Sequence, residues 1–181
     1  LSSCIDLGHR LPVSERRKRG QRRALRAGVQ VVQGRAHLAA LWLVLADNLM
    51  RNHGVTPVHT FDEISLLVDR FPEHIHVMTA VVNGVVEAGI VLFLGPTVAH
   101  AQYIASSESG YKVNALDLLF EEAIGYGSRS GKRYFDFGIS TEDQGLNLND
   151  GLAQFKNEFG AGGIVHEFYA LNLQGAGNAS E

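Results

Sequence analysis

Ionisable and polar side chains gather at the carboxyl ends of two expected strands, at residues 98–105 and 133–139. A polar turn and an amphipathic helix separate these strands. A right-handed crossover between parallel strands would bring both ends to the same edge of one sheet. The helix N-terminus at that edge would offer free backbone N–H groups to an anionic ligand. The pattern therefore predicts a site where an anion-bearing ligand meets side chains that can transfer protons.

Three side chains on these strands are candidates for proton transfer: His100, Tyr103 and Asp136. The pKa of an ordinary histidine lies near neutrality, so His100 could accept a proton or could be an ordinary strand residue. Asp136 stands between Phe135 and Phe137, and a carboxylate on a central strand needs a partner. Tyr103 could donate a proton or fill the core. By the two-residue period of a strand, Tyr103 points away from His100 unless a bulge intervenes.

An antiparallel meander of three strands is expected before the second helix–strand unit. Residues 75–82 lead into Asn83-Gly84, a dipeptide typical of a type I′ hairpin, and residues 85–94 and 98–105 follow. Two helices precede the meander. Apolar side chains at helical spacing over 36–52 indicate the first, and the capping box Thr60-Phe-Asp-Glu63 begins the second. An earlier helix and strand are expected at 14–27 and 29–33.

After the meander, helices and strands alternate. Asn114 and Asn149 are expected to cap the helices, and strands are expected at 133–139 and 165–173. The fold class is therefore α/β, with a mixed central β-sheet flanked by helices on both sides. We expect one domain over residues 14–173, a tail or linker at 1–13 and a flexible tail at 174–181.

The composition is that of a soluble globular domain. The 181 residues are 45% hydrophobic and 19% charged, which is enough for one domain with a sizeable core. The single cysteine, Cys4, rules out an internal disulfide framework and favours a cytoplasmic location. The first residues do not resemble a signal peptide. The apolar runs are too short to span a bilayer, so no membrane span is expected.

Positive charge is concentrated near the start of the chain. Residues 1–35 contain nine of the 16 Lys and Arg residues and only two of the 19 acidic ones. Such asymmetry indicates either a contact with RNA or another anionic surface, or a helix whose charges are solvated. No aromatic residue interleaves with the basic segment 16–26, which disfavours stacking on single-stranded bases. One interpretation of the chain is a non-catalytic module that contacts RNA or a protein partner through this segment.

Three motifs together match a known pattern. They are the basic segment at 16–28, the strand at 99–106 with its polar turn, and the segment Phe135-Asp-Phe-Gly-Ile-Ser140 followed by Gly151-Leu-Ala-Gln-Phe-Lys-Asn-Glu-Phe-Gly160. Over residues 14–173 the chain resembles the GNAT superfamily of N-acyltransferases. More closely it resembles the Fem-type (FemAB-like) branch, whose better-known members attach amino acids to peptidoglycan precursors. Because Fem-type enzymes usually carry two GNAT-like units, the resemblance implies the second unit of a longer protein.

The resemblance implies a transferase in which a primary amine attacks a bound acyl donor directly. In this fold two neighbouring parallel strands splay apart, and a backbone amide in the gap meets the acyl carbonyl. The expected strands are those at 102–106 and 135–140. The resemblance also implies that Lys156 meets the donor or the developing negative charge, while a solvated lysine is the alternative.

The acyl donor is left open between acyl-CoA and aminoacyl-tRNA as a co-substrate, and no tightly bound cofactor or metal is predicted. Most coenzyme-A-dependent members have one motif before the central helix. It consists of Arg or Gln, any two residues, Gly, any one residue, and then Gly or Ala. Here the loop begins with Ser107 and has Lys112 where a small residue belongs. The expected cradle for the donor phosphates is Ser106, Ser109, Gly110, Tyr111, Lys112 and Asn114. The expected contacts for the acceptor, a small-molecule or peptide amine, are His59, Gln102, Ser140 and Asn149.

Overall fold

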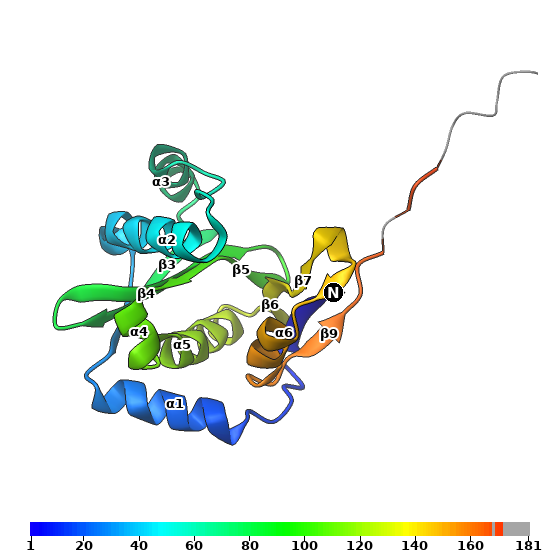
Figure 1. Cartoon of the computed structure of the whole chain (residues 1–181), viewed down its shortest axis with the longest axis horizontal. Coiled ribbons are helices and arrows are strands. Elements are labelled where there is room, and N and C mark those ends of the chain that lie inside the picture. The colour runs from blue at the N-terminus through cyan, green and yellow to red at the C-terminus, as the bar shows by residue number, and fades with distance from the viewer. Residues whose placement is uncertain (168, 172–181) are drawn as a thin grey trace, which may run out of the picture.

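The computed structural model describes residues 1–167 and 169–171. Its centre is a seven-stranded sheet in the order β2-β3-β4-β5-β6-β1-β9. Helices α2 and α3 cover one face of the sheet, α5 covers the other, and α1 lies outside α5 (Figure 1). The predicted mixed sheet with helices on both sides is therefore confirmed.

The middle of the sheet is the predicted antiparallel meander. Strands β3 (Ile75–Val82), β4 (Val85–Leu94) and β5 (Val98–Ser106) pair in order, and β2 (Gln30–Gln33) pairs with the outer edge of β3. The hairpin residues between β3 and β4 both have positive φ, as a type I′ turn requires. The sequence pattern was sufficient here because each strand is joined to its neighbour by a short turn.

Two helices cover the meander on one face. A short 3₁₀ turn, η1 (Arg35–His37), leads into α2 (Leu38–His53), and α3 (Phe61–Arg70) begins at the predicted capping box. The apolar sides of both helices pack against β3, β4 and β5, and they bury Trp42 and Ile64. This face of the sheet is called the α2 face below.

The opposite face of the sheet packs against α5 (Ala115–Arg129) and is called the α5 face. A short helix, α4 (Glu108–Lys112), lies between β5 and α5 and was not predicted. Asn114 stands at the start of α5, but it is in the left-handed conformation and its side chain makes no capping hydrogen bond, contrary to the prediction. After α5, strand β6 (Tyr134–Ile139) runs parallel to β5, as expected for the strand–helix–strand unit.

Helix α1 (Glu15–Arg26) packs on α5 rather than on the sheet. Arg17 is the buried member of the basic segment. Its guanidinium donates to Asp117 of α5 at 2.5 Å and to Glu158 at 2.9 Å, and it lies 4.8 Å from the ring centre of Phe155. Glu158 and Phe155 belong to the end of α6 (Asp150–Asn157) and its C-cap. Arg17 therefore fixes α1 to both α5 and α6.

Residues 1–13 are not a tail, contrary to the prediction. Strand β1 (Ser2–Asp6) pairs antiparallel with β6 on one side and with β9 (Gly162–Ile164) on the other. The following loop is also held, because Arg10 donates two hydrogen bonds to Glu121 at 2.9 and 2.8 Å. The short, serine-rich strand has no alternating apolar pattern that would have distinguished it from a loop.

The last strand also differs from the prediction. A strand was expected at 165–173, but β9 ends at Ile164, and residues 165–167 and 169–171 form no strand. Ile164 pairs with Ser2, the first residue of β1, so beyond it the neighbouring strand offers no further partner. The predicted tail at 174–181 lies outside the described residues.

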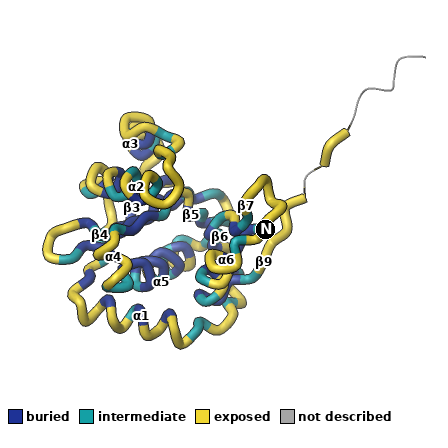
Figure 2. Tube along the Cα trace, in the orientation of Figure 1, coloured by how far each residue is buried: buried dark blue, intermediate teal, exposed yellow. Residues whose placement is uncertain are grey.

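A small hairpin connects β6 to α6. It consists of β7 (Thr141–Glu142), the 3₁₀ turn η2 (Asp143–Gly145) and β8 (Asn147–Leu148). Buried residues gather in the sheet and on the inner side of α5, whereas this hairpin and the outer side of α1 are exposed (Figure 2). Over the described residues, the helices are too short or too polar to cross a bilayer.

Candidate active site

Strands β5 and β6 pair over only three positions. Residues 98, 99 and 100 of β5 pair with residues 134, 135 and 136 of β6. Beyond His100 and Asp136, β5 continues to Ser106 and β6 continues to Ile139, but the two strands no longer pair. The sheet therefore has a wedge-shaped opening, and the edge of β5 that faces it has backbone groups with no strand partner on that side.

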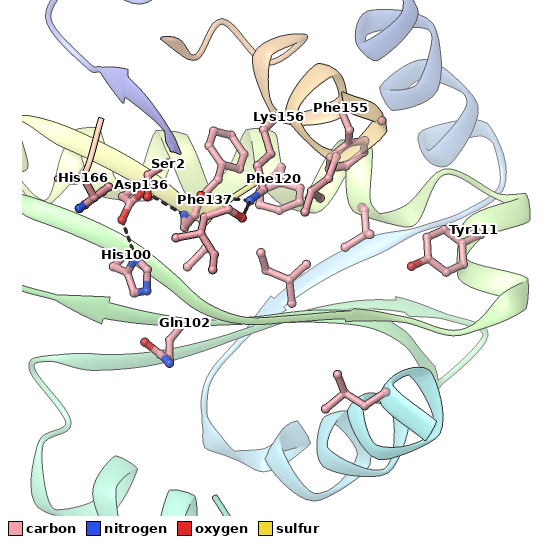
Figure 3. A pocket seen from close by; sticks show the side chains of 18 residues that line it. Ser2, His100, Gln102, Tyr111, Phe120, Asp136, Phe137, Phe155, Lys156 and His166 are labelled. Atoms are coloured by element: carbon pink, nitrogen blue, oxygen red, sulfur yellow. Dashed lines mark hydrogen bonds and ion pairs between the residues drawn. The ribbon is translucent and has the colours of Figure 1, made fainter. Parts of the chain in front are cut away.

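A cavity of about 960 Å³ occupies this opening (Figure 3). Aromatic side chains from β6, α5 and α6 line its part on the α5 face. Polar side chains from the ends of the paired strands, and one from α6, line the rest. The principal lining residues are His100, Gln102, Tyr111, Phe120, Asp136, Phe137, Phe155 and Lys156. The cavity extends through the sheet from one face to the other, because the strands on its two sides have separated.

A bulge at Gln102 changes which side chains of β5 point to which face. Val91 pairs with Tyr103 and Leu92 pairs with Ala101, so Gln102 has no partner on β4. Before the bulge, Ala101 packs on the α5 face; after it, Tyr103 packs on the α2 face, although both have odd numbers. Gln102 itself is exposed and lines the cavity.

His100 and Asp136 form a hydrogen-bonded pair at the point where the strands separate. His100 Nδ1 lies 2.8 Å from Asp136 Oδ2, and Asp136 Oδ1 accepts the backbone N–H of Gly138 at 2.9 Å. Burial acts to raise the pKa of Asp136, but the hydrogen bonds from His100 and Gly138 outweigh it and lower that pKa overall. An ionised Asp136 requires a proton on Nδ1, so a neutral His100 has its lone pair on Nε2.

Lys156 comes from α6 and is almost fully buried. Its Nζ donates to the carbonyl oxygens of Gly138 at 3.1 Å and Ile139 at 2.5 Å, at the end of β6. Burial lowers the pKa of Lys156 to about 8, and the nearby Asp136 opposes part of this shift. Lys156 is therefore a cation at neutral pH that can lose its proton within the ordinary working range.

Tyr103 and His59, predicted to act in the site, lie together elsewhere. The Tyr103 ring packs edge-on against Trp42 at 5.0 Å between centroids, and its hydroxyl is hydrogen-bonded to His59 Nδ1. Neither residue is among the described residues that line the cavity. Burial raises the pKa of Tyr103, while the contact with His59 opposes this. The pair joins the loop before α3 to β5, which is a structural contact.

One residue of the expected phosphate cradle, Ser109, is hydrogen-bonded to a carboxylate from β4. Ser107 Oγ and Ser109 Oγ both donate to Glu87 Oε2, and the Ser109 bond is 2.5 Å long. Ser106 is buried and donates to backbone carbonyls of Glu87 and Ser107, and a Cβ on Gly110 would lie 2.4 Å from the Glu87 carbonyl oxygen.

The other three residues of the expected cradle do not form a common site. Lys112 is exposed, and Asn114 is in the left-handed conformation. Among the six, only Tyr111 lines the cavity, where its hydroxyl lies 3.4 Å from the amide nitrogen of Asn48.

Two further candidates hold the local structure beside the cavity. Ser140 is fully buried, with its hydroxyl 3.3 Å from that of Ser3 on β1. Asn149 caps α6, as its side chain accepts the N–H of Leu152 at 2.9 Å and donates to Glu142 at 2.7 Å. The predicted helix start at Asn149 is confirmed, but neither residue is among those described as lining the cavity.

Sequence reasoning missed several lining residues. Gly138 lies in the segment 135–140, one of the motifs that carry the family resemblance. Its φ of 79° turns the end of β6, so that its N–H is donated to Asp136 and its carbonyl oxygen accepts from Lys156. Leu49 at the end of α2 and Ser2 on β1 also line the cavity. No sequence pattern pointed to them, because they come from segments far away along the chain.

The comparisons with known proteins agree with this geometry. A family profile described as "Acetyltransferase (GNAT) domain" matches residues 13–156. Because the match covers most of the chain, the protein belongs to the GNAT acetyltransferase-domain family. A search of curated proteins gave no significant match. A mixed sheet with two splayed parallel strands and a cavity between them thus defines a GNAT-type N-acyltransferase domain.

Several solved structures share the fold. FemX matches with a TM-score of 0.71 and 11% identity, over 88% of this chain and 58% of that one. The C-terminal domain of a putative lysylphosphatidylglycerol synthetase from Agrobacterium fabrum matches with a TM-score of 0.64 and 14% identity, over 87% and 55%. An aminoglycoside acetyltransferase from a soil metagenome matches with a TM-score of 0.55 and 10% identity, over 80% and 97%. The chain thus spans little more than half of the first two.

The family implies acyl-CoA as the co-substrate, and the loop after β5 does not fit its diphosphate. A diphosphate at that loop needs free N–H and hydroxyl donors. Here the Ser107 N–H is donated to the Glu87 carbonyl at 2.8 Å and the Gly110 N–H to Ser107 Oγ at 2.9 Å. The two serine hydroxyls are donated to the Glu87 carboxylate. The hydroxyl donors of the loop are therefore already bound to an anion within the protein, the Glu87 carboxylate.

Proposed function

We propose that the chain is an N-acyltransferase domain that moves an acyl group from an activated ester or thioester to a primary amine by direct attack. The observation that carries this proposal is the convergence of His100, Asp136 and Lys156 on a cavity between two splayed parallel strands. No residue of the described cavity lining is a cysteine or a serine paired with a base, which accords with direct attack rather than a covalent intermediate.

In this mechanism His100 accepts the proton of the attacking amine. The amine nitrogen forms a bond to the acyl carbon, and its surplus proton passes to His100 Nε2. Asp136 holds the opposite ring nitrogen and keeps the proton there, so Nε2 remains the basic atom. The negative Asp136 also stabilises the imidazolium that forms. A positioned base of this kind contributes roughly 10² to 10⁴ in rate.

In this mechanism Lys156 acts on the leaving group. Breaking the bond between the acyl carbon and the donor leaves a thiolate or an alkoxide, which needs a proton or a nearby positive charge. Lys156 carries that charge beside the end of β6, and its pKa of about 8 lets it give up a proton near neutral pH. The unpaired edge of β5 supplies backbone groups that can hold the donor in line with the amine.

The transferred group, in this proposal, is acetyl or aminoacyl, carried as a thioester or on the 3′ end of a tRNA. The acceptor is a small-molecule or peptide amine. One structurally similar protein, an aminoglycoside acetyltransferase solved with sisomicin, supports an amine acceptor. Because the chain spans little more than half of FemX, we further propose that it is the second unit of a longer cytoplasmic protein.

The test is an acyl-transfer assay with the purified chain. Radiolabelled acetyl and aminoacyl donors, presented as thioesters and as tRNA esters, are incubated with a panel of primary amines, and amide formation is followed by mass spectrometry. We expect amide product from at least one donor class, and its loss in His100→Gln. Product formation that is unchanged in His100→Gln and in Lys156→Met would contradict the proposed site.

A second candidate function rests on the outer side of α1. Arg19, Arg22, Arg23 and Arg26 are exposed there, and none forms an ion pair with another described residue. A row of guanidinium groups without acidic partners suits the phosphate backbone of RNA. The candidate is a GNAT-like module that binds RNA through α1, with or without catalysis.

This candidate is tested by the salt dependence of RNA binding. If α1 binds RNA, affinity falls steeply with salt, and replacing Arg22 and Arg23 by Ala lowers both the affinity and the steepness. Replacing exposed Arg70 of α3, on the other side of the sheet, by Ala serves as the control. Salt-independent binding, or an equal effect of the control, would reject RNA binding by α1.

A further inference from the structure

We propose that Glu87 is a specificity residue: its carboxylate occupies the place of a donor diphosphate and thereby excludes coenzyme A in favour of an acyl carrier without a diphosphate at that position. The inference rests on the proposed acyltransferase function and names its donor class. Glu87 lies on β4 beside the splayed strand β5, one strand away from the cavity. No feature of its own strand pattern distinguishes it.

The contacts of Glu87 are those of a bound anion. Its Oε2 accepts the hydroxyls of Ser107 and Ser109, which are the N-cap residue and a first-turn residue of α4. Its backbone carbonyl accepts the N–H of Ser107 at 2.8 Å. The protein therefore already supplies the anion that this position would otherwise take from a ligand.

The side of the loop that faces β4 has no room for a second anion beside Glu87. Gly110 lies so close to β4 that a Cβ on it would be 2.4 Å from the Glu87 carbonyl oxygen and 2.5 Å from Ser106 Oγ. The other charged groups near the loop are of both signs. Glu108 lies in the first turn of α4, and its Oε1 is 3.6 Å from Arg51 Nη1. Arg51 Nη2 also pairs with Asp47 Oδ2 at 3.0 Å. A diphosphate would meet Glu87 directly, and like charges at contact are strongly unfavourable.

The cavity itself remains open to the acyl end of a donor. Tyr111 and Leu49 line it near α4, and His100 and Asp136 line it at the point where the strands separate. A pantetheine-like arm or an aminoacyl ester can enter this space without placing phosphates on α4. The exclusion thus concerns the carrier's phosphates rather than the reacting group.

The test compares two ligands that differ at the diphosphate. Pantetheine has no phosphate, whereas dephospho-coenzyme A adds the diphosphate and adenosine. Both affinities are measured by calorimetry for the wild-type chain, for Glu87→Gln and for Glu108→Gln. The last variant is the matched control, because it removes the same charge from the neighbouring helix without touching a serine hydroxyl. Thermal unfolding of each variant establishes that it is folded.

We expect the wild type to bind dephospho-coenzyme A no more tightly than pantetheine. Glu87→Gln should raise the affinity for dephospho-coenzyme A by about tenfold and leave the affinity for pantetheine unchanged. Glu108→Gln should leave the ratio of these two affinities as it is in the wild type. Tight wild-type binding of dephospho-coenzyme A, or a ratio that Glu87→Gln does not move, overturns the proposal. Failure of the acyltransferase function would show itself differently, as the absence of amide product from every donor in the transfer assay.

Discussion

Asp136 and Lys156 hold the same glycine from two sides. Asp136 Oδ1 accepts the N–H of Gly138 at 2.9 Å, and Lys156 Nζ donates to its carbonyl oxygen at 3.1 Å. Gly138 has a φ of 79°, a conformation that costs other residues about 1–2 kcal/mol. The negative and positive side chains are therefore connected through one peptide segment, and His100 completes the chain on the other oxygen of Asp136.

Asp136→Asn should abolish most of the activity while preserving the fold. Asn has a single acceptor oxygen, and when that oxygen accepts the Gly138 N–H, the amide nitrogen faces His100 Nδ1 as a donor. This arrangement places the imidazole proton on Nε2, so Nε2 is no longer the basic atom. We expect kcat/KM for acyl transfer to fall by about 10² or more. Asp143→Asn, on the exposed hairpin, is the control and should leave kcat/KM unchanged. Equal activity in the wild type and in Asp136→Asn would remove the pair from the mechanism.

Lys156→Met should change how stability depends on pH. Burial lowers the pKa of Lys156 from 10.5 to about 8, so between these values the unfolded chain binds more protons than the folded one. The contribution of Lys156 to the free energy of unfolding therefore rises with pH over this window, by up to about 3 kcal/mol, and is flat below pH 8. Denaturant unfolding at pH 7, 8 and 9 should show the wild type gaining stability relative to Lys156→Met.

Cys4 must be considered in the same measurement. Burial, with the nearby Asp136 and Asp6, raises the pKa of its thiol from 9.0 to about 11, so its contribution to stability is lost as pH rises from about 9 to 11. This effect has the opposite sign, but it is present in both proteins and cancels in their difference. A difference between wild type and Lys156→Met that stays constant from pH 7 to 9 would show that Lys156 titrates normally.

Tyr103→Phe should leave catalysis intact. The hydroxyl is hydrogen-bonded to His59 on the α2 face and is not among the described groups that line the cavity. We expect unchanged kcat/KM and a loss of about 0.5–1.5 kcal/mol in the free energy of unfolding, the usual effect of one hydrogen bond. A fall in kcat/KM of about 10², as a proton donor would give, would instead restore Tyr103 to the active site.

Arg17→Ala and Arg23→Ala should differ strongly although they lie on the same helix. Arg17 is buried between Asp117 and Glu158, and its removal leaves the buried Asp117 carboxylate without its ion-pair partner, at a cost of about 3–5 kcal/mol. Arg23 is exposed, and its removal should change stability by no more than about 0.5 kcal/mol. Chemical denaturation measures both values. Similar stabilities of the two variants would show that the buried network contributes little.

The local elements were predictable because their signals are local. The capping box at Thr60, the hairpin at Asn83 and Gly84, and the cap at Asn149 depend on residues within a few positions of one another. The pairing of His100 with Asp136 was also within reach, because a carboxylate between two buried phenylalanines has to find a partner. The sequence by itself thus determined the meander, the larger helices, the mixed sheet and the candidates for proton transfer, but not β1, α4 or the position of β9.

The tertiary structure alone decided which candidates meet. The bulge at Gln102 reverses the faces of β5, and nothing within the strand marks it, because a bulge depends on the partner strand. Likewise β1 is a strand only because β6 and β9 lie on either side of it. Glu87 reaches Ser107 and Ser109 across about 20 residues of chain, a contact that no periodicity encodes. Long-range contacts form when separate segments pack together, so the shape of the cavity and the contacts of Glu87 became visible only in the folded molecule.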